Sequence, residues 1–146
     1  MQSLKSLSII AVLCLGSAAM ATASDPRQLV ELPSMMHQHM LANMRDHLLA
    51  ITEIQRALSA GAFEQAADIA ERRIGMSSLA SHGASHMAPY MPKEMQEIGT
   101  QMHRAASQFA VVAQESAVDG NIKRAIGSLA AVTQQCVACH SAFRIN

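Results

Sequence analysis

Apolar residues recur every three to four positions through most of this chain, and no other feature constrains its fold as strongly. This spacing places apolar side chains on one face of an α-helix, whereas in a half-buried strand they alternate at every second residue. The composition supports the same interpretation, because the 146 residues include 11 Met but only three Phe, one Tyr and no Trp. Strands favour aromatic and β-branched residues. We therefore predict an all-α chain.

The spacing predicts four helices. The first begins near Pro26 or at Pro33, since proline suits the first helical turn, and it ends near Gly61. The other three are expected at residues 62–74, 92–118 and 121–143. On the last helix the expected inner face consists of Ile122, Ile126, Leu129, Val132, Cys136, His140 and Phe143. Four amphipathic helices in one short domain favour an antiparallel four-helix bundle.

Residues 1–23 have the parts of a cleavable export signal. Lys5 precedes an apolar run at residues 7–15, and Ala21-Thr22-Ala23 forms a small-x-small cleavage site. The run is too short to span a bilayer, which needs a helix of roughly 20 residues, so we expect cleavage rather than a retained anchor. The expected product is one domain, residues 24–146, in the periplasm of a Gram-negative bacterium, without stable membrane insertion.

Cleavage would remove Cys14 and leave Cys136 and Cys139, which belong to the sequence Cys-Val-Ala-Cys-His ending at His140. C-x-x-C-H is the signature of covalent c-type haem attachment. Residues three and four apart share one face of a helix, so both thiols and the imidazole would point the same way. We predict one haem c per chain, bonded to both cysteines, with His140 as the proximal iron ligand.

Other uses of paired cysteines fit this sequence less well. A thioredoxin-like redox pair requires a βαβ context, whereas this pair falls late in a predicted helix. A structural zinc site would usually need four ligands, and the chain has no second cysteine pair. A disulfide between residues three apart would close a very short loop and would constrain the unfolded chain little.

The export signal, the four-helix pattern and a C-x-x-C-H near the C-terminus, followed by Phe143 and Arg144, together resemble the cytochrome c′ family and its six-coordinate relatives. The resemblance implies a haem between the first, third and fourth helices, with the distal residue on the first helix. Relatives of this fold often dimerise, so a homodimer is also allowed. Arg144 could contact a haem propionate, or it could be a cation at the negative end of the helix dipole.

The family's distal position falls within residues 35–44. Met40 lies on the inner stripe closest to that position, Met44 is a less favoured candidate one turn further, and Met36 lies one turn earlier. A thioether opposite a histidine is a known haem ligand pair that raises the reduction potential. Methionine also fills gaps in a core poor in rings, so a structural role stays open.

Two further alternatives concern the distal side and the segment at residues 75–91. His37 or His39 could replace methionine on the iron, or the distal site could be empty. If residues 81–87 were helical, His82 and His86 would share a face and could hold a metal or cover a haem edge. The glycines and Pro89 favour instead a loop across the end of the bundle, with solvated histidines.

The expected function is single-electron transport between redox partner proteins rather than enzymatic turnover. The sequence contains no nucleophile elbow and no phosphate loop. Its 11 Lys+Arg are balanced by 11 Asp+Glu, so no basic surface for nucleic acid is expected. One alternative is a five-coordinate haem protein that binds NO or CO. Another is a His/Met-rich periplasmic copper-binding bundle without haem, because imidazole and thioether ligands suit copper.

Overall fold

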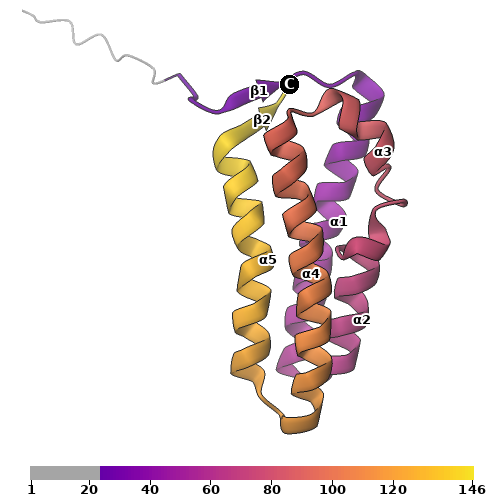
Figure 1. The fold of residues 1–146 in the computed structure, drawn as a ribbon, viewed down its shortest axis with the longest axis vertical. Coiled ribbons are helices and arrows are strands. Elements are labelled where there is room, and N and C mark those ends of the chain that lie inside the picture. Colours follow the sequence, from indigo (N-terminus) through magenta and orange to yellow (C-terminus); the bar gives the residue numbers. More distant parts are fainter. Residues whose placement is uncertain (1–23) are drawn as a thin grey trace, which may run out of the picture.

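The computed structural model describes residues 24–146, so the predicted export signal lies outside the described residues. The prediction of a chain built mainly from helices is confirmed (Figure 1). The long helices are α1 (Ser34–Ser59), α2 (Phe63–Arg73), α4 (Lys93–Asp119) and α5 (Ile122–Ala142). They run along the long axis of the molecule, and α4 packs against both α2 and α5 while α2 packs against α1.

The helix boundaries follow from local sequence signals. Pro33 directly precedes α1 with a φ of −54°, so the alternative start near Pro26 is wrong. Gly61 and Gly120 adopt left-handed φ values of 73° and 69°, which lets the chain reverse between α1 and α2 and between α4 and α5. The Asn121 side chain caps α5 by accepting a hydrogen bond from the Arg124 backbone N–H at 3.1 Å.

A short two-stranded sheet, which the sequence did not predict, joins the two ends of the described chain. Strand β1 (Gln28–Val30) pairs in parallel with β2 (Phe143–Ile145), with Gln28 opposite Phe143. Because Phe143 takes an extended conformation, α5 ends at Ala142, one residue before the predicted end. Strands of three residues are too short to show an alternating pattern, and this pairing depends on contacts between distant parts of the chain.

The largest core lies between the four long helices and includes the fully buried side chains of Ile54, Ile74 and Phe109. The buried stripe of α5 consists of Ala125, Leu129 and Val132. Two residues expected on this inner face are not there, because Ile126 is 54% exposed and His140 is exposed. They are separated by nearly four helical turns, so both lie on the same flank of α5, outside its buried stripe.

The segment between α2 and α4 folds into three short turns of helix. These are a 3₁₀ turn at Met76–Ser78, helix α3 (Ala84–Met87) and a second 3₁₀ turn at Ala88–Tyr90. Gly83, with a left-handed φ of 62°, separates His82 from α3, so His82 and His86 do not belong to one continuous helix. His86 is exposed as expected, but His82 is half-buried, which corrects the expectation that both histidines are solvated.

Candidate functional site

The last two turns of α5 carry the predicted attachment residues. Helix α5 continues without interruption to Ala142, so Cys136, Cys139 and His140 keep their helical spacing of three and four residues. Both thiols are free and half-buried, whereas His140 is exposed. The Cys136 thiol lies 3.6 Å from the Val132 carbonyl oxygen, one turn earlier, and donates to it. The thiols therefore lie at the edge of the core, with the imidazole on the solvent side.

A second apolar cluster, which we call the methionine cluster, lies at the end of the molecule where α1 begins and α5 ends. Its buried members are Val30, Leu32, Met87, Met95 and Phe143. Half-buried side chains that pack against them are Met36, Met40, Met91, Ile98, Cys139, Ala142 and Ile145. Five methionines from α1, the α2–α4 connection and α4 thus gather beside the second cysteine of the motif.

The structure brings one predicted distal candidate to the motif more clearly than the other. Met40 on α1 and Cys139 on α5 both pack against the methionine cluster. Met36, one turn before Met40, also belongs to it, whereas Met44 is half-buried and is not among the cluster's members within residues 24–146. Cys136 packs against the larger core instead. The two thiols therefore span the boundary between the two apolar clusters.

The two histidines of α1 proposed as alternative distal ligands, His37 and His39, differ in their contacts. The His39 Nε2 atom donates a hydrogen bond to the His82 backbone carbonyl at 2.8 Å, so this ring holds the α2–α4 connection. His37 is half-buried. The Nε2 atom of His39 is therefore engaged in holding this connection and not in a hydrogen bond with the C-x-x-C-H motif.

Burial raises the pKa of the Cys136 thiol, and burial together with the neighbouring Cys136 raises the pKa of the Cys139 thiol. Both groups are therefore protonated at neutral pH. Catalytic redox cysteines need the opposite environment, in which nearby positive charge lowers the thiol pKa. This chemistry argues against a thioredoxin-like use of the pair.

Residues just before β1 cover the end of α5, a feature that the sequence did not indicate. The Arg27 guanidinium donates to the His140 backbone carbonyl at 3.3 Å and pairs with Asp25 at 2.7 Å. Hydrogen bonds from Arg27 lower the pKa of Asp25 to about 2. Arg144 Nε also lies 3.7 Å from the Asp25 carboxylate, within ion-pair distance, but it is buried and has no hydrogen-bond partner in residues 24–146.

These residues fit a covalently bound haem on the chemistry of the donor set. Two neutral thiols lie on one helical face with an exposed imidazole, whose ring nitrogens make no hydrogen bond to the described residues. Next to them lie the thioethers of the methionine cluster and the Nε atom of Arg144, which makes no hydrogen bond within residues 24–146 and could donate one to an anionic group. No helix within residues 24–146 is both long enough and apolar enough to cross a bilayer.

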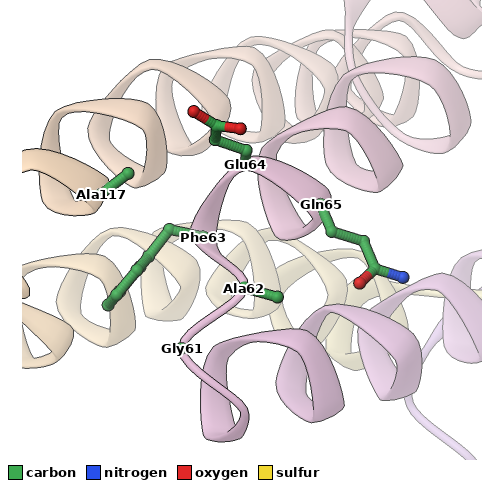
Figure 2. Close-up of a pocket in the computed structure, with 6 residues that line it drawn as sticks. All are labelled: Gly61, Ala62, Phe63, Glu64, Gln65 and Ala117. Carbon is green, nitrogen blue, oxygen red and sulfur yellow. The ribbon is translucent and has the colours of Figure 1, made fainter.

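A surface hollow at the opposite end of the molecule has no connection with this chemistry. It lies at the turn between α1 and α2, beside the end of α4 (Figures 1 and 2). Its lining residues are Gly61, Ala62, Phe63, Glu64, Gln65 and Ala117. Glu64 is the only charged side chain among these lining residues, so the hollow offers no set of converging charged groups.

Comparison of the chain with protein-family models, with curated proteins and with solved structures found no match. The assignment of function therefore depends on the residues and their arrangement.

Proposed function

We propose that this protein is an exported monohaem c-type cytochrome that carries single electrons between redox partner proteins. Cys136 and Cys139 would form the two thioether bonds, and His140 would be the proximal ligand. When bound, haem supplies a one-electron Fe(III)/Fe(II) couple, and its surroundings tune the potential. The protein's own contribution is to hold the group, to supply axial ligands and to limit the access of water.

The observation that carries this proposal is that Cys139 on α5 and Met40 on α1 pack against the same methionine cluster. A C-x-x-C-H motif at the end of a helix can serve as a haem site only if neighbouring elements provide a place for the haem. Here the facing elements offer thioethers, which ligate haem iron and raise its potential. Met40 is accordingly the proposed distal ligand, in preference to Met44, and this supports a six-coordinate iron over an open NO or CO site.

The α2–α4 connection contributes to the same environment. Met87 and Met91 come from this segment and belong to the methionine cluster with Cys139. Apolar side chains at this end would exclude water from the haem edge and lower the local dielectric constant, both of which affect the reduction potential. We infer that the connection covers the haem through these methionines and not through His86, which is exposed.

The finer fold and the location of the protein are part of the same proposal. Four long helices joined by glycine turns at Gly61 and Gly120 support an antiparallel four-helix bundle similar to cytochrome c′. A c-type haem is attached outside the cytoplasm, and this agrees with the export signal expected at residues 1–23. The periplasm of a Gram-negative bacterium is the proposed location.

The test is to express the full chain in a bacterium that has the c-type maturation machinery. The intact mass should correspond to residues 24–146 plus one haem, and the denatured protein should stain for haem because the attachment is covalent. The matched control changes Cys136 and Cys139 together to Ala and should be exported without a retained haem. A wild-type chain recovered from this host without haem would overturn the proposal.

A further inference from the structure

Three histidines from three different elements meet beside the first turn of the α2–α4 connection. His47 comes from α1, His82 from the connection and His103 from α4. Their ring centroids are 4.7 Å apart for His47 and His82, 5.5 Å for His82 and His103, and 6.0 Å for His47 and His103. We call this group the histidine trio. None of its members belongs to the C-x-x-C-H motif or to the methionine cluster.

Hydrogen bonds fix the tautomer of two rings in the trio, that is, which ring nitrogen carries the proton. His103 Nδ1 donates to the backbone carbonyl of Ile74. The Ser78 hydroxyl gives its one proton to the Gly75 carbonyl at 2.7 Å, so His82 Nδ1, 3.3 Å from the Ser78 oxygen, must be the donor to that oxygen. In the neutral form both rings therefore carry the lone pair on Nε2.

The third ring contains a buried polar atom without a partner. His47 is only 7% exposed, and its Nε2 atom has no hydrogen-bond partner among residues 24–146. A buried polar atom is almost always paired, so an unpaired one points to an absent ion or water. His47 thus contributes a nitrogen that has no role in the structure as described.

We propose that the histidine trio binds a divalent first-row transition-metal ion through three imidazole nitrogens. Imidazole suits Zn²⁺, Cu²⁺ and Ni²⁺. The hydrogen bonds that the Nδ1 atoms of His103 and His82 donate to Ile74 and Ser78 are of the kind that orient metal-ligating histidines. Three protein ligands on a tetrahedral ion would leave a fourth position for water or an anion.

The ring separations agree with this proposal. With a metal–nitrogen distance of about 2.0–2.1 Å, each imidazole centroid lies about 3.2 Å from the ion, and two such rings on a tetrahedral ion are about 5.2 Å apart. The observed separations of 4.7, 5.5 and 6.0 Å bracket that value. In residues 24–146 no group of three or more His, Cys, Asp or Glu side chains is already placed to hold a metal ion, so these side chains must shift as the ion binds.

The protonation state of the rings and the charges beside them are also compatible with a bound metal ion. Burial lowers the pKa of His47 to about 4 and lowers the pKa of His82, so both rings are neutral at pH 7 and compete weakly for protons. The nearby Arg73 guanidinium is paired with two carboxylates, those of Asp46 and Glu53. Two negative charges against one positive charge leave these neighbours with a net negative charge.

Helix α1 holds the segment that carries His82 in place. The His82 carbonyl accepts hydrogen bonds from His39 Nε2 at 2.8 Å and from the Asn43 side-chain amide at 3.1 Å. Gly83 follows in the left-handed conformation, and a Cβ atom there would lie 3.0 Å from His39 Nε2. Two residues of α1 thus fix the backbone at His82 close to His47, which lies on the same helix.

The experiment titrates metal-free protein with Zn²⁺ and, in a second arm, with Cu²⁺ by isothermal calorimetry. The cysteines are blocked, either as haem thioethers or by alkylation, so that the thiols cannot bind the ions. Loss of an outer-shell partner weakens metal sites by about 10–100-fold, so loss of a ligand in His47→Ala or His103→Ala should weaken binding by at least about 100-fold. The matched control, His86→Ala, removes an exposed histidine outside the trio and should bind as tightly as wild type.

A second measurement does not depend on the folding of any variant. In the wild type, one equivalent of diamagnetic Zn²⁺ should shift the ring NMR signals of His47, His82 and His103 and leave that of His86 unchanged. The proposal is overturned if the wild type binds neither ion with a Kd below about 0.1 mM, or if the signals of the trio do not respond. The arm with the tighter binding identifies the preferred ion, and the result is independent of whether haem is attached.

Discussion

The imidazole rings of His47 and His82 lie 4.7 Å apart at their centroids, inclined by 65°, although one belongs to α1 and the other to the connection between α2 and α4. Neither ring can gain a proton easily. Burial, followed by the neighbouring rings of His82 and His103, lowers the pKa of His47 to about 4. Burial and His103 also lower the pKa of His82. The burial of these two rings, together with their contacts, makes the stability of the fold sensitive to acid.

We expect the free energy of unfolding to fall as the pH decreases from about 6.5 to 4. The unfolded chain takes up a proton on His47 below its usual pKa of 6.5, whereas the folded protein does so only near 4. Protonation of His47 should lower the free energy of unfolding by about 3 kcal/mol, and His82 should act in the same direction. Above pH 6.5 this destabilisation is absent. Urea unfolding in EDTA at pH 7, 5.5 and 4.5 measures it. His47→Gln should show a shallower dependence, and an equal slope would contradict the assignment.

The second prediction concerns the distal ligand. Met40→Ala should convert a low-spin ferric haem spectrum into a high-spin one and should lower the reduction potential, because a thioether ligand raises the potential. The control, Met35→Ala, removes a side chain that is 76% exposed and should leave the spectrum unchanged. Visible spectra of the oxidised and reduced proteins measure the spin state of the iron. A wild-type spectrum that is already high-spin would favour the open-site alternative instead.

The third prediction compares two glycines. Gly83→Ala should destabilise the fold by about 1 kcal/mol or more, because alanine is strained at a φ of 62° and its Cβ would lie 3.0 Å from the His39 ring. Gly99→Ala should stabilise it by up to about 1 kcal/mol, since Gly99 lies within α4 and a Cβ there would meet nothing within 4 Å. Thermal unfolding of both variants tests the pair. Equal effects would mean that the connection is not fixed against α1.

The fourth prediction tests the main core. Ile54 on α1 is fully buried, so Ile54→Ala should lower the free energy of unfolding by about 2–5 kcal/mol. Leu48→Ala removes an apolar side chain of the same helix that is 70% exposed, and its effect should be within about 0.5 kcal/mol. Urea unfolding measures both values. A large effect at Leu48 would indicate that this side chain is covered in solution.

The sequence by itself determined the features that depend on neighbours along the chain. Helical spacing predicted the four long helices, Pro33 predicted one of the two proposed starts for α1, and Gly61 predicted the turn that follows it. Likewise, the apolar spacing of residues 121–143 predicted that Cys136, Cys139 and His140 lie within one helix, as they do. In each case the signal and its consequence lie within a few residues, so propensity and steric limits on φ are sufficient.

Only the tertiary structure decided which faces and segments meet. The sequence placed Ile126 and His140 on the inner face of α5, but both are exposed in the structure. From the sequence, His82 was expected to be solvated in a loop, or to share a face with His86 if residues 81–87 were helical, whereas the structure places His82 against His47 and against a histidine of α4. The β1–β2 pairing and the partners of the methionine cluster are further examples. Such contacts depend on how whole helices pack and on loop geometry, and neither leaves a local pattern in the sequence.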